Sequence, residues 1–330
     1  MDLRTTYLGL NLPHPFMPGA SPMVDRLDLV KRLEDAGASA ILMHSLFEEQ
    51  LMKEELATYH HIEAPSESFA EALTYLPKPD EFNLGPDQYL EQLVRIKQAV
   101  DVPVIASLNG FTSGGWIRYA RLMQDAGANA LELNVYYLAT NPDESGEDVE
   151  ARTLEILKAV KQAVTIPVSI KLSPFFSSFA NMAKRLDEAG ADGLVLFNRF
   201  YQPDIDVDAL EVEPTLRLSD SSELNLRLRW LAVVSGHVKA SLAVSGGVHT
   251  SLDAVKAVMT GAHAVQVVSA ILQQGPDVLR RIREGVAQWL EEHEYESLEQ
   301  MRGSMNLLHC PDPSSFERAN YIRILQGYKV

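Results

Sequence analysis

Cysteine is almost absent from this chain of 330 residues, since Cys310 is the only one. A single cysteine cannot form an internal disulfide bond, and it cannot hold an iron–sulfur cluster, which needs several thiolate ligands. If the protein works with such a cluster, we expect the cluster to lie on a separate subunit.

Basic residues are fewer than acidic ones in this chain, and long apolar runs are absent. It has 29 Lys and Arg against 45 Asp and Glu, which gives a formal net charge of −16. A nucleic-acid partner needs a basic stripe, so we expect none. No apolar stretch reaches 18 residues and the N-terminus has no signal-peptide pattern, so we expect no membrane partner and a cytoplasmic location.

The remaining composition is that of a globular protein. Hydrophobic residues make up 46% of the chain and charged residues 22%, which is enough to build a large core. Because α/β barrels of this length commonly form one domain, we expect a single domain over residues 1–330. Within it we predict a barrel over about 15–290 and a helical extension over about 291–330 that packs against the barrel.

One pattern occurs four times and sets the fold class. Each copy is the end of a helix, a glycine, and a short apolar strand. Glycine ends a helix readily because it adopts the left-handed conformation without steric cost. Apolar strands of this kind are typical of parallel sheets covered by helices on the outside. The four copies are Leu33–His44, Met123–Asn134, Leu186–Asn198 and Val258–Ser269.

Four further strands alternate with these copies, at Phe16–Ala20, Val104–Leu108, Val168–Leu172 and Leu242–Ser245. Helical segments separate the strands, so the sequence predicts eight βα units and a (β/α)₈ barrel, a TIM barrel, of class α/β. An open, doubly wound sheet is the alternative, because periodicity does not show closure. The long segments 46–86 and 199–224 follow strands, and we expect them to cover the C-terminal face.

Polar residues follow nearly every predicted strand. In a barrel of this kind the active site forms where the strands end, so these side chains are expected to converge. Each alone has a simpler explanation, since asparagine often forms turns or caps, and a lysine such as Lys171 can lie on the surface. The residues at the strand ends, all polar except Ala20, are Ala20, Ser21, His44, Ser45, Asn109, Asn134, Lys171, Asn198, Ser245 and Ser269.

Two consecutive strand ends predict a phosphate site. Ser245-Gly246-Gly247 follows one strand and Val268-Ser269 follows the next. Glycines let backbone N–H groups approach phosphate oxygens, and barrels place such sites after the seventh and eighth strands. The alternative is that the glycines form an ordinary turn.

The ordered motifs over about residues 1–300 resemble the dihydroorotate dehydrogenase family of flavin mononucleotide (FMN) barrels. The matching segments are Pro15-Phe16-Met17, Leu131-Glu132-Leu133-Asn134, Ile170-Lys171-Leu172-Ser173-Pro174, Asn198, Ser245–Val248 and Gln266–Ala270. The resemblance implies an FMN-dependent oxidoreductase that oxidises dihydroorotate or a related cyclic amide by hydride transfer to flavin, in pyrimidine biosynthesis. It also implies that Lys171 stabilises the negative charge of the reduced flavin.

The same resemblance assigns the candidate site residues. Those implied to bind FMN are Ala20, Ser21, His44, Asn109, Asn134, Lys171, Ser245, Gly246, Gly247, Val268 and Ser269. Those implied to bind substrate are Asn83, Asn134 and Asn198, and the catalytic candidates are Tyr137 and Lys171. No metal site is expected.

The sequence departs from the family pattern at two of these positions. Tyr137 stands where the family usually has a catalytic Cys or Ser, and a phenol is a poor base at neutral pH unless a cation is near it. His44 stands where the family often has a flavin-contacting lysine. The departure at Tyr137 concerns the named reaction, and the departure at His44 changes one flavin contact.

Two other functions remain open at this stage. One is a barrel lyase or aldolase in which Lys171 forms a Schiff base. The other is a catalytically degenerate flavoprotein subunit, which the missing Cys or Ser suggests. The resemblance further implies a small-molecule substrate, a homodimer and a separate electron-transfer subunit as partners.

Overall fold

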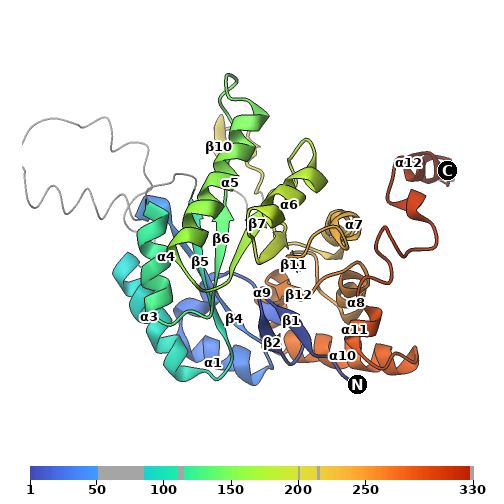
Figure 1. Ribbon diagram of the computed structural model, residues 1–330, viewed down its shortest axis with the longest axis horizontal. Helices are drawn as coiled ribbons and strands as arrows, with labels where there is room; N and C mark the ends of the chain where they lie inside the picture. Colours follow the sequence, from blue (N-terminus) through green and yellow to red (C-terminus); the bar gives the residue numbers. More distant parts are fainter. Residues whose placement is uncertain (51–84, 111–114, 200, 214–215, 328–330) are drawn as a thin grey trace, which may run out of the picture.

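The computed structural model describes residues 1–50, 85–110, 115–199, 201–213 and 216–327. Its centre is a parallel sheet of eight strands in the order β3-β12-β11-β8-β7-β6-β5-β4 (Figure 1). These strands are β3 (Phe16–Pro18), β4 (Ile41–Phe47), β5 (Val104–Gly110), β6 (Ala130–Val135), β7 (Val168–Leu172), β8 (Gly193–Leu196), β11 (Ser241–Ser245) and β12 (Ala264–Val267).

The sheet curls into a nearly closed barrel. Apart from the step between β12 and β3, neighbouring strands follow chain order, and β3 and β4 are the two ends. Ser39, just before β4, joins them, because its backbone N–H and its hydroxyl both donate to the carbonyl of Phe16, at 3.0 and 2.8 Å. The predicted (β/α)₈ barrel is confirmed, and the open sheet is not observed.

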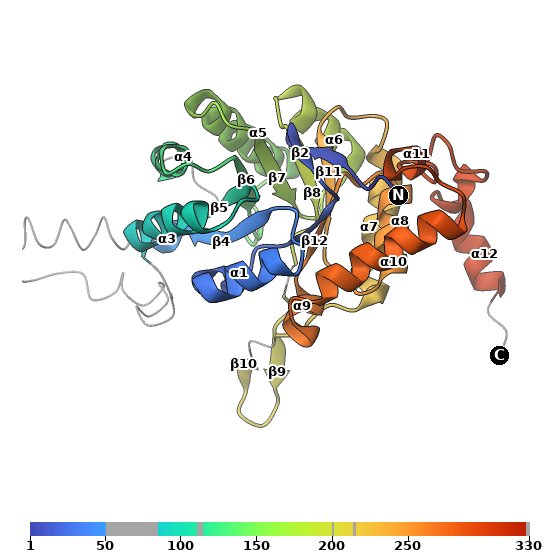
Figure 2. The same ribbon diagram turned by 90° about the horizontal axis from the view of Figure 1, so that it is seen from below.

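Helices surround the barrel on its outside (Figures 1 and 2). The flanking helices are α1 (Leu27–Asp35), α3 (Pro86–Ala99), α4 (Gly115–Asp125), α5 (Gly146–Ala163), α6 (Phe179–Glu188), α7 (Leu224–Val234), α8 (Ser251–Met259) and α10 (Val278–Glu292). The other helical elements are η1 (Pro22–Asp25), η4 (Ser221–Glu223), α9 (Ser269–Gln274), α11 (Leu298–Met301), η5 (Pro313–Ser315) and α12 (Ala319–Gly327). The glycines of the four sequence repeats, Gly37, Gly127, Gly190 and Gly261, all have positive φ at the helix ends, as predicted.

The strands divide their side chains between two cores. Along β6, Leu131 and Leu133 pack outward against the helices, and Ala130 packs inside the barrel. The alternation follows from the two-residue period of a strand. It also directs Glu132 and Asn134 inward, so the barrel interior becomes polar toward the C-terminal ends of the strands.

A hairpin that the sequence did not reveal closes the opposite end of the barrel. Strands β1 (Thr5–Tyr7) and β2 (Leu10–Leu12) pair antiparallel, and Tyr7 and Leu8 are buried among the inward-facing apolar residues. These include Met17, Leu42 and Val195. The hairpin therefore supplies part of the barrel core.

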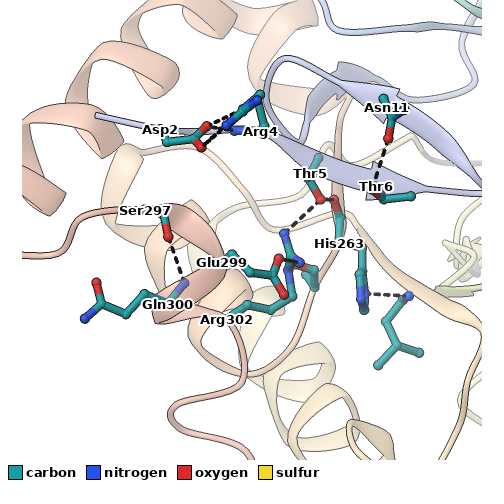
Figure 3. A network of polar contacts seen from close by, with 12 residues as sticks. Asp2, Arg4, Thr5, Thr6, Asn11, His263, Ser297, Glu299, Gln300 and Arg302 are labelled. Carbon is teal, nitrogen blue, oxygen red and sulfur yellow. Dashed lines mark hydrogen bonds and ion pairs between the residues drawn. The ribbon is translucent and has the colours of Figure 1, made fainter.

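Residues 298–302, at α11 and just after it, hold this hairpin in place (Figure 3). Arg302, which follows α11, donates from Nη2 to the Thr5 hydroxyl at 2.8 Å, and Thr5 donates to the carbonyl of His263 at 2.8 Å. The backbone N–H of Leu298 donates to the carbonyl of Asp2 at 2.8 Å. Segments almost 300 residues apart in the chain are thus joined at the end of the barrel that the hairpin closes.

Two parts of the structure project from the barrel. The predicted long segment 199–224 contains an antiparallel hairpin of β9 (Asp204–Asp206) and β10 (Glu211–Glu213), which stands away from the barrel (Figure 2). Helix α12 also lies apart (Figure 1), and Tyr321 and Ile324 on it are more than 60% exposed. Within the predicted C-terminal extension, α11 contacts α8, whereas α12 leaves its apolar residues exposed. Among the described residues, no helix has the length and apolarity needed to cross a membrane.

Candidate active site

Three predicted site residues end neighbouring strands at the same level. Asn109 on β5 is in register with Asn134 on β6, and Asn134 is in register with Lys171 on β7. Because the strands are parallel, their C-terminal ends meet at one mouth of the barrel. The structure therefore brings these three side chains together as the sequence predicted.

Asn198 reaches the same group from the segment after β8. Its Nδ2 donates to Oδ1 of Asn134, and both residues are buried, with 7% and 8% of their surface exposed. The contact leaves the other amide atoms of both side chains available for a ligand. Two residues predicted to hold the substrate are thus direct neighbours.

Lys171 belongs to a buried network with Glu132 and Gln266. Its Nζ lies 3.5 Å from Oε1 of Glu132 and 3.4 Å from Oε1 of Gln266, and Nε2 of Gln266 donates to Oε2 of Glu132 at 2.6 Å. Gln266 is fully buried and Glu132 is 1% exposed. Removing a buried pair's partner is costly because the remaining group loses its only compensation for desolvation. Glu132 and Gln266 therefore hold Nζ of Lys171 at the barrel mouth.

Neither Glu132 nor Gln266 was among the predicted site residues. A signal was present for Glu132, because it stands two residues before Asn134 and must face the same side of the strand. Gln266 likewise stands two residues before Val268, on β12, the strand that leads into the second predicted phosphate turn. A buried Glu and a buried Gln inside apolar strands indicate a polar interior.

The turn after β11 needs its two glycines. Gly246 and Gly247 have φ of +88° and +81°. A Cβ on Gly246 would lie 2.8 Å from Nη2 of Arg227, and a Cβ on Gly247 would lie 2.5 Å from the backbone N of Leu224. Helix α7 therefore packs directly against the predicted phosphate turn. Arg227 is 5% exposed and also donates to the carbonyl of Ser245.

Ser219 links the two predicted phosphate turns. Its backbone N–H donates to the Ser269 hydroxyl at 3.0 Å, and its own hydroxyl accepts from the backbone N–H of Gly247 at 3.3 Å. The same hydroxyl lies 3.3 Å from Nε2 of His249. The turns after β11 and β12 are thus neighbours in space, as the sequence predicted.

The segment after β3 lies beside the same turns. Gly19 donates its N–H to the carbonyl of Val267 at 3.0 Å, which places Ala20 and Ser21 next to Val268. The hydroxyl of Ser21 is buried and has no hydrogen-bond partner among the described residues. A buried hydroxyl without a partner is costly, and a bound polar ligand would satisfy it. These residues fit a flavin phosphate or ribityl chain.

His44 lies at a bulge in β4. The pairing of β4 with β5 shifts register between Leu42 and Ser45, and His44 Nδ1 is 2.7 Å from Oδ1 of Asp25. The imidazole also meets the ring of Tyr89 edge-on at 5.1 Å. Asp25 and Tyr89 therefore fix the orientation of the His44 imidazole.

Tyr137 forms a cluster with Glu144 and Arg152. Its hydroxyl donates to Oε2 of Glu144 at 2.6 Å, and the Arg152 guanidinium carbon lies 4.5 Å from the centre of its ring. The hydrogen bond from Tyr137 and the pairing with Arg152 hold the pKa of Glu144 below its usual value. Tyr137 thus has both a cation and a carboxylate beside it.

Two further sequence expectations concern Asn83 and metal binding. Asn83 lies outside the described residues. Among the residues that the structure describes, no three His, Cys, Asp or Glu side chains gather in a way that could hold a metal ion.

Comparison with known proteins finds similar chains over most of the length. The model of the family described as dihydroorotate dehydrogenase matches residues 81–290. An Aeropyrum pernix protein assigned as a dihydroorotate dehydrogenase A (fumarate) is 34% identical over 67% of this chain and 73% of its own. The catalytic subunit of a dihydroorotate dehydrogenase B (NAD(+)) of Methanothermobacter thermautotrophicus is 30% identical, over 67% and 74%.

One relative has a different name. The NAD-dependent dihydropyrimidine dehydrogenase subunit PreA of Escherichia coli is 24% identical over 92% of this chain and 77% of its own. Similarity therefore extends to relatives whose named substrates differ.

Proposed function

The chain belongs to the dihydroorotate dehydrogenase family, and on this premise we propose that it binds FMN at the barrel mouth and oxidises dihydroorotate or a related cyclic amide. It is an oxidoreductase of the dehydrogenase type, from a family of flavoproteins. The observation that carries the proposal is the convergence of Asn134 on β6 and Lys171 on β7 with Asn198 from the segment after β8, next to the strands β11 and β12 whose turns are predicted to bind phosphate.

The residues for FMN divide into two groups. The turns at Ser245–Gly247 and Val268–Ser269, with Ala20 and Ser21 beside them, would hold the phosphate and the chain. At the other end, Asn109, Asn134, His44 and Lys171 would contact the ring. The flavin supplies hydride acceptance, and Lys171, held by Glu132, would stabilise the negative charge that develops.

Asn134 and Asn198 would orient the substrate. Neutral amides donate and accept hydrogen bonds, which suits the alternating N–H and C=O groups of a cyclic amide or a carboxylate. Asn83, which the resemblance adds to this group, remains a prediction. Because Asn134 is also expected to contact the flavin, it would hold both molecules in reacting distance.

Tyr137 would serve as the acid–base group. Its hydroxyl proton is already donated to Glu144, so the phenol oxygen could accept a proton from substrate as its own proton moves to Glu144. The guanidinium of Arg152 lies over the same ring and pairs with Glu144, so it would hold both groups in place for this transfer. Both neighbours come from the segment between β6 and the first half of α5.

The Schiff-base lyase is less well supported. A Schiff base needs Nζ of the lysine free to attack a carbonyl carbon, and Nζ of Lys171 already lies 3.5 Å from Oε1 of Glu132 and 3.4 Å from Oε1 of Gln266. Borohydride trapping of a carbonyl compound on Lys171 would favour the lyase. The degenerate flavoprotein subunit differs from the proposed enzyme only in that no substrate would reduce its flavin.

Several partner assignments are part of the same proposal. We expect a single domain in the cytoplasm, a homodimer, and a separate electron-transfer subunit. The last is supported by the relatives from Methanothermobacter thermautotrophicus and Escherichia coli, both of which are named as subunits of NAD-linked enzymes. A role in pyrimidine biosynthesis would follow if dihydroorotate is the substrate.

The test is spectroscopic. The purified protein should be yellow, absorb at roughly 450 nm and release FMN on denaturation. Anaerobic addition of dihydroorotate, dihydrouracil or dihydrothymine should bleach this band, and the compound that does so identifies the substrate class. A colourless protein that does not take up FMN would refute the proposal, and a yellow protein that only dithionite reduces would identify the degenerate subunit.

A further inference from the structure

A cavity of about 490 Å³ opens beside the proposed substrate site. It lies between the segment after β8 and the start of α7, and Asn198 belongs to its wall. Three arginines line it, namely Arg199, Arg217 and Arg227. In a chain with a net charge of −16, three arginines in one cavity are an unusual local concentration of positive charge.

The arginines are only partly neutralised. Among the residues that line the cavity, Glu223 and Asp204 are the two carboxylates, so one positive charge remains in excess. Nη2 of Arg199 pairs with Oε1 of Glu223 at 3.0 Å. Nη1 of Arg199 is buried and has no hydrogen-bond partner among the described residues. A buried guanidinium N–H without an acceptor points to a ligand that supplies one.

Arg227 adds a second guanidinium that is held in place. Its Nε donates to the carbonyl of Ser245 and its Nη1 to the carbonyl of Glu223, the latter at 2.7 Å. Burial lowers the pKa of Arg227, Glu223 opposes this effect, and the charge of Arg199 lowers the pKa further. Arg199 and Arg227 both line the cavity, so an anion bound there would offset two like charges.

The rest of the wall suits an organic molecule. Phe175, Phe197 and Leu226 provide apolar surface, and Tyr201 lies under the guanidinium of Arg199, whose carbon is 5.6 Å from the ring centre. A free inorganic ion would not need this surface. Asn198 connects the cavity with the mouth of the barrel, where the reacting ring is expected.

We propose that this cavity binds an oxyanion, a carboxylate or a phosphate ester, carried by the substrate at the end remote from the ring that Asn134 and Asn198 hold. The inference rests on the proposed function, since it defines the substrate of the same site. It implies a larger substrate than a cyclic amide whose only charged group sits on the ring.

Three variants and one control test the site. Arg199→Gln and Arg217→Gln each remove a charged donor, and Arg229→Gln, on the exposed side of the same helix as Arg227, is the control because Arg229 does not line the cavity. Glu223→Gln removes the competing carboxylate and should improve anion binding. Arg227 is left unchanged because it also supports the turn at Gly246.

The measurement is a ³¹P line-broadening titration with inorganic phosphate on protein saturated with FMN, so that the predicted flavin phosphate site is filled. Acetate competition in the same titration compares a carboxylate with phosphate. We expect the dissociation constant to rise about tenfold in Arg199→Gln and Arg217→Gln, because each loses a charge-assisted hydrogen bond. In Glu223→Gln it should fall about threefold, and in Arg229→Gln it should not change.

The outcomes separate this site from the flavin site. Equal phosphate binding in Arg199→Gln and Arg229→Gln, or no binding by the unmodified protein, would overturn the inference. So would a loss of FMN, rather than of phosphate, in the two arginine variants. A colourless protein that still binds phosphate through these arginines would refute the flavin proposal and support the anion site.

Discussion

Lys171 and Glu132 form an ion pair inside the barrel, with Nζ and Oε1 3.5 Å apart and Gln266 bonded to both. The two residues come from neighbouring strands, β7 and β6, and neither side chain is more than 8% exposed. The pair as a whole is neutral, and Glu132 and Gln266 fix where the Lys171 amine lies at the barrel mouth. The position of Lys171 therefore depends on a residue that does not reach the surface.

We expect Glu132→Gln to destabilise the protein by about 3 kcal/mol, because it leaves the buried ammonium of Lys171 without its counter-ion. Urea unfolding followed by circular dichroism measures the change. Glu291→Gln, at an exposed position of α10, is the matched control and should leave the unfolding midpoint unchanged.

A double variant checks the cause. Glu132→Gln combined with Lys171→Met removes both charges, so it should be less destabilised than the sum of the two single variants. Additive losses would show that the two residues do not interact energetically.

Gly247→Ala should cost at least about 2 kcal/mol of stability and reduce the FMN content of the purified protein. A Cβ there is strained by φ of +81° and would lie 2.5 Å from the backbone N of Leu224. Gly146→Ala is the control, because φ at Gly146 is not positive and a Cβ there meets nothing within 4 Å. Normal FMN content in Gly247→Ala would contradict the assignment of this turn to the phosphate.

Tyr137→Phe should slow flavin reduction by substrate about a hundredfold, since acid–base groups contribute on that order. Anaerobic stopped-flow absorbance measures the rate, with whichever dihydropyrimidine bleaches the flavin. FMN affinity should not change, because the proposed FMN contacts do not include the phenol. Tyr321→Phe, on the exposed surface of α12, provides the comparison.

An unchanged rate in Tyr137→Phe would mean that its bonds to Glu144 and Arg152 serve only to order the segment after β6. In that case Glu144→Gln should lower stability and leave the pH profile of the reaction as it was.

Stability should rise with pH between about 4 and 6.5, with His263 as one cause. Burial, reinforced by the charge of Arg302, lowers the pKa of His263 to about 4. Between this value and the ordinary value near 6.5, the unfolded chain binds the proton and the folded chain does not, so folding is favoured as pH rises. The contribution of His263 to the free energy of unfolding is fully present above pH 6.5 and is lost as the pH falls toward 4. The change amounts to roughly 3 kcal/mol.

His263→Asn tests this origin. The imidazole Nδ1 accepts from the backbone N–H of Leu242 at 3.1 Å, and an Asn oxygen can accept in its place without titrating. Urea midpoints measured at pH 5 and pH 7.5 should differ less in this variant than in the unmodified protein. Burial also lowers the pKa of His14 to about 4, so part of the dependence should remain. His237→Asn, at an exposed position, should behave like the unmodified protein.

The barrel was predictable because its signals are local. The glycine after each helix is needed by the turn itself, as the positive φ of Gly37 and Gly127 shows, and the strand that follows is short and buried on both faces, as β6 is. The same holds for the turn at Gly246 and Gly247. Asn109, Asn134 and Lys171 were predictable as neighbours because parallel strands end at one face.

Other features could not be read from sequence because their partners are far away along the chain. In the sequence, the segment that forms β1 and β2 has no pattern that predicts a hairpin. Its apolar residues Tyr7 and Leu8 are explained only by their burial in the inner core of the barrel. Helix α12 has the spacing of a packed helix, yet its apolar residues stay exposed. Periodicity shows which residues share a face and does not show what that face meets.

The sequence by itself determined the eight βα units, the polar strand ends and the family resemblance, since these depend on residue order and on conformations a few residues long. Only the tertiary structure decided that Glu132 and Gln266 hold Lys171, that Tyr137 bonds Glu144, and that Arg199 and Arg227 face one cavity. Such contacts join strands and loops up to 134 residues apart. They arise from the register and curvature of the closed sheet, which no local pattern in the chain encodes.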